Sequence, residues 1–158
     1  MTEEHLSMIL LSKKHLIKDN KLKTYFLDAC ALIAFLLKEE GFENVKKIII
    51  DADDEKIVLK MNQINLLEVY SHLYGNYGRE AANNALEKIK LLPIQIINKL
   101  DEKVFRLAGR LKPQYTLSLG DSVVTAECLN NNDTLITGDH KDFEPIKKKE
   151  NIKINWFR

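Results

Sequence analysis

The fold is decided by one stretch near the start of the chain, Thr24-Tyr25-Phe26-Leu27-Asp28-Ala29-Cys30-Ala31-Leu32-Ile33-Ala34-Phe35-Leu36-Leu37. Residues 24–27 are β-branched, aromatic or leucine, a composition typical of a buried strand. The wholly apolar run 31–37 is typical of a buried helix. A strand that leads directly into such a helix is how an α/β unit begins. We therefore expect the folded domain to start here.

Further short strands and longer helices alternate along the rest of the chain. Strands are expected at 56–60, 94–97, 134–137 and 152–156, and helices at 42–52, 62–74, 79–91, 98–112 and 121–130. This alternation predicts an α/β fold whose mainly parallel sheet is covered by helices on both faces. Because no internal repeat or interior linker is visible, we expect one domain, 24–158, preceded by an N-terminal extension, 1–23.

The composition is that of a soluble globular protein. Hydrophobic residues make up 45% and charged residues 30% of the 158 residues, which is enough for a substantial core. The 24 Lys and Arg against 23 Asp and Glu give a net charge of +1. A protein that holds nucleic acid by its overall charge is usually far more basic. Any contact with nucleic acid must therefore depend on local basic patches.

The apolar segments and the cysteines indicate the cellular environment. The longest apolar run, Ala29 to Leu37, is far shorter than the roughly 20 residues that cross a bilayer, so no membrane partner is expected. Cys30 and Cys128 each stand alone in an apolar run, which argues against a zinc site or a disulfide. Both cysteines suit a reducing compartment, and we expect a cytoplasmic protein.

Four acidic residues lie within or directly beside apolar stretches: Asp28, Glu68, Asp121 and Asp139. An unpaired charge is costly in such surroundings. Sites in parallel α/β sheets lie at the carboxyl ends of the strands, where Asp28 and Asp139 are expected. Clustered carboxylates raise one another's pKa unless a cation is present. Mg²⁺ or Mn²⁺ takes such oxygen ligands, and a site of this kind can activate water and hold a phosphodiester.

Each acid also has a purely structural interpretation. Asp28 and Asp121 could cap the N-termini of helices. Asp139 could be a turn residue in Gly138-Asp139-His140. Glu68 could form an ion pair with Arg79 or with a lysine. Both kinds of interpretation stay open for each residue at this stage.

Four blocks of sequence resemble the PIN-domain nucleases, most closely the small VapC-type toxins of prokaryotic toxin–antitoxin pairs. The blocks are Tyr25-Phe26-Leu27-Asp28-Ala29-Cys30-Ala31-Leu32-Ile33-Ala34, Asn65-Leu66-Leu67-Glu68-Val69-Tyr70, Leu117-Ser118-Leu119-Gly120-Asp121-Ser122-Val123-Val124-Thr125-Ala126 and Leu135-Ile136-Thr137-Gly138-Asp139-His140-Lys141-Asp142-Phe143. Their order and spacing span residues 24–156. The resemblance implies a three-layer α/β/α sandwich and an endoribonuclease that depends on Mg²⁺ or Mn²⁺.

The resemblance also implies roles for particular residues. Asp28 and Asp121 would hold the principal metal ion, and Glu68 and Asp139 would complete its shell directly or through water. Thr137, Cys30 and Asn65 would support these acids. Cys30 departs from the family, which usually has Ser, Thr or Asn there, and a thiol is a weaker hydrogen-bond donor. The metal would activate a water for in-line attack on phosphorus while a carboxylate relays the proton.

Substrate and partners follow from the same resemblance. Basic or polar side chains near the site, Lys38, Arg79, His140 and Lys141, are candidates for contacts with RNA phosphates. An antitoxin protein is a possible partner, and the tyrosine-rich helix 62–77 suits a homodimer or the core. The alternatives to a ribonuclease are a PIN-like module that binds RNA or protein without cleaving it, and a DNA- or structure-specific nuclease.

Overall fold

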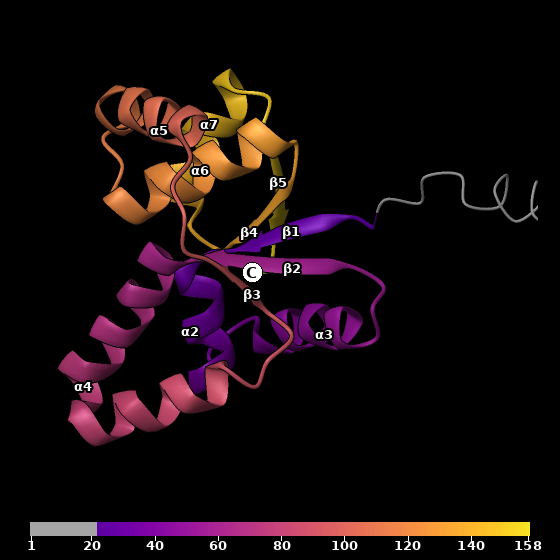
Figure 1. The fold of residues 1–158 in the computed structure, drawn as a ribbon, viewed down its shortest axis with the longest axis vertical. Coiled ribbons are helices and arrows are strands. Elements are labelled where there is room, and N and C mark those ends of the chain that lie inside the picture. The colour runs from indigo at the N-terminus through magenta and orange to yellow at the C-terminus, as the bar shows by residue number, and fades with distance from the viewer. Residues whose placement is uncertain (1–21) are drawn as a thin grey trace, which may run out of the picture.

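The computed structural model describes residues 22–158, which form the three-layer arrangement of Figure 1. The first strand, β1, spans Thr24–Leu27 and begins where the sequence predicts. The expected N-terminal extension, 1–23, lies outside the described residues except for Leu22 and Lys23. No helix within residues 22–158 is both long enough and apolar enough to cross a membrane.

The sheet has five strands, and every neighbouring pair in it is parallel. β1 lies at the centre of the order β3-β2-β1-β4-β5. The other strands are β2 (Val58–Asn62), β3 (Gln95–Ile97), β4 (Thr134–Thr137) and β5 (Lys153–Trp156). The prediction of a mainly parallel sheet is therefore confirmed.

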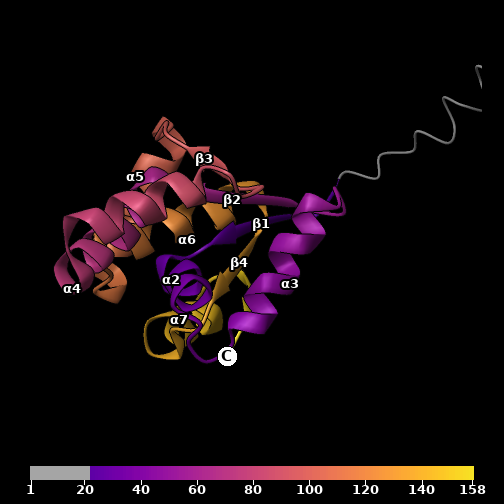
Figure 2. The same cartoon turned by 90° about the horizontal axis from the view of Figure 1, so that it is seen from below.

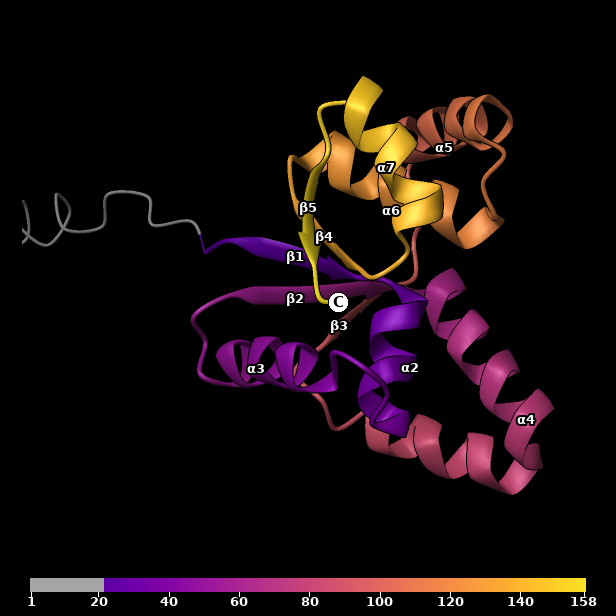
Figure 3. The same ribbon diagram turned by 180° about the vertical axis from the view of Figure 1, so that it is seen from behind.

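Helices cover both faces of the sheet (Figures 1 and 3). One face carries α2 (Ala29–Leu37), α3 (Phe42–Asp53) and α4 (Gln63–Ile89). The other face carries α5 (Glu102–Tyr115), α6 (Leu119–Asn131) and α7 (His140–Lys149). The α/β/α sandwich is thus confirmed.

The sheet has a hydrophobic core on each of its two faces. Side chains of the central strands β1 and β4 point alternately into one core and the other. In β1, Leu27 joins the α2–α4 core whereas Phe26 joins the α5–α7 core. In β4, Ile136 joins the α2–α4 core and Leu135 joins the α5–α7 core. Because successive side chains of a strand point to opposite faces, each strand contributes to both layers. All four side chains are buried, which is why these strands read as unbroken apolar runs.

Several element boundaries differ from the predicted ones. The two helices expected at 62–74 and 79–91 are both present under one label, α4; the first extends further than predicted, and they meet at a kink at Gly78, where φ is 84° and ψ is 173°. Glycine tolerates this positive φ without steric cost. The helix expected at 98–112 begins only at Glu102, behind an Asp101 N-cap. α6 begins at Leu119, because Ser118 rather than Asp121 is its N-cap.

The sequence reasoning missed α7 altogether. Charged residues dominate this helix, and only Phe143 and Ile146 are buried from it, so it shows little apolar periodicity. Its termini nevertheless carry helix signals. Asp139 caps the first turn, and Lys147, Lys148 and Lys149 occupy the last turn, where positive charge is favourable.

Candidate active site

The parallel sheet brings the carboxyl ends of all its strands to one edge. Asp28 directly follows β1, and Asp139 stands two residues beyond the end of β4. β1 and β4 are hydrogen-bonded neighbours, so these acids arise side by side. Glu68 comes to the same edge from the second turn of α4, and Asp121 from the first turn of α6. The candidate site therefore lies where the sheet rule predicts.

Asp28 is the most constrained of these acids. Its side chain is 3% exposed, and both oxygens accept hydrogen bonds. Oδ1 accepts from the Ala29 amide at 2.7 Å and from Asn65 Nδ2 at 3.3 Å. Oδ2 accepts from the Thr137 hydroxyl at 2.8 Å and from Cys30 Sγ at 3.1 Å. Asp28 is also the N-cap of α2, so its structural interpretation is confirmed.

An amide pair at the start of α4 links Asp28 to Glu68. Asn62, the last residue of β2, caps α4 by accepting from the Asn65 amide at 2.8 Å. Its own amide group donates to Asn65 Oδ1, which directs Asn65 Nδ2 toward the acids. That nitrogen donates to Asp28 and also, at 3.2 Å, to Glu68 Oε2. Asn65 therefore contacts two of the four acids, and Asn62, which was not foreseen, orients it.

Glu68 and Asp121 approach each other across the α4–α6 contact. A Cβ placed on Gly120 would lie 2.6 Å from the Glu68 carboxyl carbon, so only glycine leaves room for this carboxylate. The Ser118 hydroxyl accepts from the Asp121 amide at 3.0 Å and donates to Asp121 Oδ2 at 2.7 Å. Within residues 22–158, no hydrogen bond engages Asp121 Oδ1. In the part of the chain that the structure describes, Glu68 contacts Asn65 and Gly120 and forms no ion pair with Arg79 or a lysine.

Thr137 joins Asp28 and Asp139, the first and last of the four predicted acids in chain order. Its hydroxyl donates to Asp28 Oδ2 and accepts from the Asp139 amide at 3.1 Å. Asp139 Oδ1 in turn accepts from the Asp142 amide at 3.1 Å, which makes Asp139 the N-cap of α7. Thr137 thus connects the acid that follows β1 to the acid that follows β4.

The carboxyl groups perturb one another. Burial and the nearby Asp121 charge raise the pKa of Asp28 from 3.8 to about 6. Burial and Asp121 also raise the pKa of Glu68. The pKa of Asp121 is itself raised, first by burial and then by the Asp142 and Asp139 charges. Asp121 is therefore the charge that links the four predicted acids electrostatically.

Asp142 is an acid that the sequence reasoning did not single out. It lies in the first turn of α7, three residues after Asp139, and its charge contributes to the raised pKa of Asp121. Its neighbours in the sequence are mostly polar, so it is not one of the acids that lie within or directly beside apolar stretches. The three-residue spacing from Asp139 was the available signal, because residues three apart in a helix lie on one face.

The donor set suits a hard divalent cation. Carboxylate oxygens are the ligands that such ions prefer, and Gly120 leaves the space that the Glu68 carboxylate occupies. As arranged in residues 22–158, no three acidic, histidine or cysteine side chains converge closely enough to hold a metal ion. Asp28 is fixed by four donors, whereas Glu68 and Asp121 lie on helices and are only partly buried. Asp28, Glu68, Asp121 and Asp139 are the residues that could hold such a cation.

The predicted substrate-binding residues are not equally placed. His140 adjoins the site, stacks on Trp156 at 4.1 Å and contacts the Arg158 carbonyl at 3.0 Å. Lys141 is exposed in the first turn of α7. Lys38 caps the far end of α2 from Asp28, and Arg79 follows the α4 kink, so neither stands at the carboxylates.

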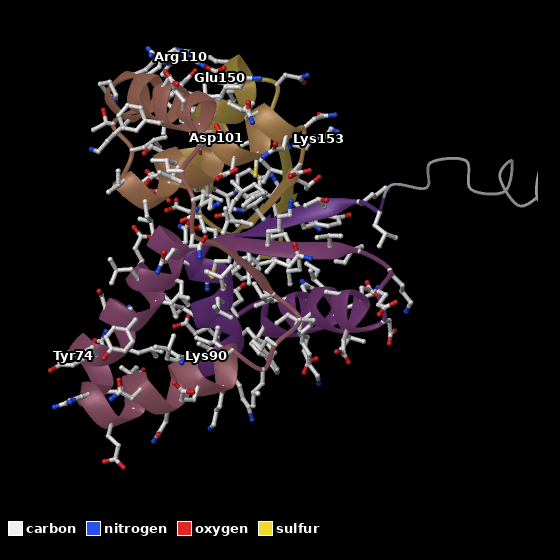
Figure 4. All side chains as sticks on the ribbon, in the orientation of Figure 1. Tyr74, Lys90, Asp101, Arg110, Glu150 and Lys153 are labelled. Carbon is white, nitrogen blue, oxygen red and sulfur yellow. The ribbon has the colours of Figure 1, made fainter. Side chains whose placement is uncertain are left out.

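Cys30 and the tyrosines also have defined positions. Cys30 lies against Asp28 Oδ2, and its own pKa is raised to about 12 by burial and by the Asp28 charge. Tyr74 and Tyr77 are 49% and 56% exposed, so of the two alternatives expected for them, the core or a homodimer interface, the core is excluded. Figure 4 shows Tyr74 on the outer side of α4.

Comparison with known proteins agrees with this geometry. The family model of the PIN domain matches residues 25–149. No protein with a curated function matches the sequence significantly. Among solved structures, VapBC from Salmonella typhimurium bound to DNA is similar with a TM-score of 0.66 and 14% identity, over 87% of this chain and 99% of that chain.

Two further structures show the same likeness. VapBC2 from Rickettsia felis, bound to a DNA fragment from its promoter, has a TM-score of 0.65 and 17% identity, over 84% of this chain and 97% of that chain. VapC20 from Mycobacterium tuberculosis, a toxin that cleaves the sarcin–ricin loop, has a TM-score of 0.59 and 13% identity, over 77% of this chain and 94% of that chain. At these identities the likeness establishes the fold. Since the family model also matches most of the sequence, the chain belongs to the PIN-domain family.

Proposed function

We propose that this protein is a metal-dependent endoribonuclease that hydrolyses RNA phosphodiester bonds at Asp28, Glu68, Asp121 and Asp139. The supporting observation is that Asp28, which is 3% exposed and accepts from four donors, lies at the same edge of the sheet as Glu68, Asp121 and Asp139. Acids held together at a cost to stability are typical of functional sites. Mg²⁺ or Mn²⁺ would offset their repulsion, with Asp28 and Asp121 as principal ligands and Glu68 and Asp139 completing the set.

The acidic residues have different roles in the proposed hydrolysis. When bound, the cation supplies an activated water and positive charge for the phosphoryl oxygens. Asp28 positions the site, because four donors hold its carboxylate in one orientation. Glu68 and Asp121 are only partly buried, which leaves one of them accessible to accept the proton of the attacking water.

The substrate and partners are proposed from the similar structures. VapC20 cleaves a ribosomal RNA loop by its description, and this supports RNA as substrate. VapBC proteins are toxin–antitoxin complexes, which supports a toxin role and an antitoxin protein as partner. We place the protein in the cytoplasm, where such a partner and RNA would meet it. A homodimer would cover the exposed Tyr74 and Tyr77 of α4, and a monomer in light scattering at tens of micromolar would contradict it.

A second candidate function is a PIN-like module that binds RNA or protein without cleaving it. The favouring observation is that no three candidate ligands converge within the described part of the chain. The two functions differ in their response to metal. A nuclease should gain thermal stability from Mn²⁺, because the ion binds only the folded site, whereas a binding module should not.

The deciding experiment is cleavage of a labelled panel of RNA and DNA in Mg²⁺, Mn²⁺ or EDTA, with Asp121→Asn in parallel. We expect cleavage of RNA in Mg²⁺ or Mn²⁺, none in EDTA, and none by Asp121→Asn. Glu80→Gln, an exposed acid on α4, is the matched control and should cleave normally. RNA binding without cleavage in any metal would favour the second candidate. Cleavage of DNA alone would replace the ribonuclease with a DNA-directed enzyme.

A further inference from the structure

β5 delivers a basic side chain to the same edge as the acids. It is the edge strand beside β4, and the pair is parallel with Thr137 opposite Trp156. Since Asp139 follows β4, the residues that follow β5, Phe157 and Arg158, reach the same edge of the sheet. Figure 2 shows this end of the chain between α7 and α3.

Phe157 anchors this end of the chain. Its ring is 1% exposed, its amide donates to the Thr137 carbonyl at 3.2 Å, and its carbonyl accepts from Asn44 Nδ2 at 2.8 Å. A Cβ on Gly41 would lie 2.7 Å from the Phe157 ring, so the loop before α3 closes directly over it. The backbone that carries Arg158 is therefore held on both sides.

The Arg158 side chain lies against the turn that presents Asp139. A Cβ on Gly138 would lie 2.8 Å from Arg158 Cγ and 2.8 Å from Nε, so only glycine permits this approach. The Gly138 amide faces Cys30 Sγ at 3.5 Å, and that sulfur contacts Asp28 Oδ2. Only Gly138 and the Cys30 thiol therefore lie between the Arg158 side chain and the buried Asp28.

Among residues 22–158, the guanidinium of Arg158 has two partners: its central carbon lies 5.1 Å from the centre of the Phe157 ring, and it forms one ion pair beyond the C-terminal end of α2. Its ion pair is with Glu39 on a long 3.4 Å contact, and the two side chains are 30% and 41% exposed. Exposed pairs of this kind contribute little. Arg110, by contrast, makes a two-pronged contact with Glu150 at 2.9 and 3.1 Å, at the end of the molecule labelled in Figure 4. Arg158 keeps donors available that Arg110 has already used.

We propose that Arg158 binds a backbone phosphate of the RNA beside the one that is cleaved. The inference rests on the proposed ribonuclease function. A strand laid along the carboxyl edge of the sheet would have one phosphate at the acids and a neighbouring phosphate over the Gly138 turn. An arginine at that turn can hold a phosphate through two N–H groups. His140 positions it, since its ring contacts the Arg158 carbonyl and stacks on Trp156.

The test measures RNA binding by the full chain in EDTA, where no cleavage is expected, by anisotropy of a labelled single strand across a salt series. Arg158→Gln should weaken binding about tenfold and reduce the slope of log affinity against log salt by about 0.7. Arg158→Lys should keep the slope, because it keeps the charge. Arg106→Gln is the matched control, because Arg106 is an equally charged, 75% exposed residue on α5 paired with Glu102.

Kinetics in Mn²⁺ give a second readout. Arg158→Gln should raise KM about tenfold with kcat within twofold of wild type, because the contact is present in both ground and transition state. Unchanged affinity and salt slope for Arg158→Gln, with a wild-type melting temperature, would overturn the inference. Wild-type protein that binds RNA without cleaving it would instead overturn the nuclease proposal, and the affinity comparison would still decide the role of Arg158.

Discussion

Gly120 on α6 and Glu68 on α4 are in direct contact, with the glycine Cα facing the carboxylate. A methyl group on Gly120 would stand 2.6 Å from the carboxyl carbon. The two residues are 52 positions apart, and each lies beside an exposed leucine, Leu119 and Leu67. Gly120 is therefore required by a side chain at the site rather than by its own backbone conformation.

Gly120→Ala should separate activity from stability. The added methyl group displaces the Glu68 carboxylate, so cleavage should fall at least about tenfold, as losses of supporting contacts at metal sites do. The free energy of unfolding should change by less than about 1 kcal/mol, because the carboxylate can swing outward and alanine favours the helix. Urea denaturation and initial cleavage rates measure the two effects.

The matched control for this change is Gly109→Ala on α5. No atom lies within 4 Å of a Cβ placed there, so this variant should keep full activity and gain a little stability. Full activity in Gly120→Ala would mean that Glu68 does not need the position it has in this structure.

Thr137→Val should destabilise the protein by about 1–3 kcal/mol. The hydroxyl both donates to Asp28 Oδ2 and accepts from the Asp139 amide, so its removal leaves the Asp139 amide without this partner and Asp28 Oδ2 with the weaker Cys30 thiol alone. Valine has nearly the same shape, which limits the effect to the hydrogen bonds. Thr137→Ser keeps the hydroxyl and should stay within about 1 kcal/mol of wild type in chemical denaturation. Equal losses in both variants would indicate a role for the methyl group instead.

The stability of the metal-free protein should fall as pH rises from 5 to 7. The pKa of Asp28 is about 6 in the fold and 3.8 as a free group, so between these values the native state binds more protons than the unfolded state. Unfolding free energy therefore decreases with rising pH, by about 1 kcal/mol from this group across that interval. The raised pKa values of Glu68 and Asp121 add to the same trend. Denaturation in EDTA at both pH values measures it.

Two comparisons attribute this pH effect to the site. Mn²⁺ at pH 7 should restore the lost stability, because it binds the ionised acids of the native state. Asp121→Asn removes the charge that raises the pKa of both Asp28 and Glu68, so its stability in EDTA should depend less on pH. Metal-free protein that is more stable at pH 7 than at pH 5 would show that these acids do not repel one another.

Both cysteines should resist alkylation in the folded protein. Burial and the Asp28 charge raise the pKa of Cys30 to about 12, and burial raises that of Cys128. Since only the thiolate reacts, iodoacetamide at pH 8 should leave both unmodified, whereas in urea both should react. Mass spectrometry after limited exposure reports each site separately. Rapid modification of Cys30 in the native state would place its thiol outside the contact with Asp28.

Local patterns were sufficient for most elements but not for all. β1 and α2 were predictable because uninterrupted apolar runs have few other stable arrangements in water. α7 was not predictable, because only Phe143 and Ile146 are buried from it. Its other residues are mostly charged, so the sequence shows no apolar period of a helix. The start of α6 was also missed, since Ser118 and Asp121 both suit a helix N-terminus and only the observed hydrogen bonds distinguish them.

The sequence by itself determined the α/β class, the parallel sheet and the four acids set in apolar surroundings. It could do so because both signals are local. The periods of strands and helices, and the cost of a charge among apolar residues, depend on residues that are close together in the sequence. Only the tertiary structure decided which groups meet: Thr137 with Asp28, Gly120 with Glu68, and Arg158 with Gly138. These contacts join residues from different strands and helices. They depend on the strand order β3-β2-β1-β4-β5 and on how α4 and α6 pack at its carboxyl edge, which no local pattern encodes.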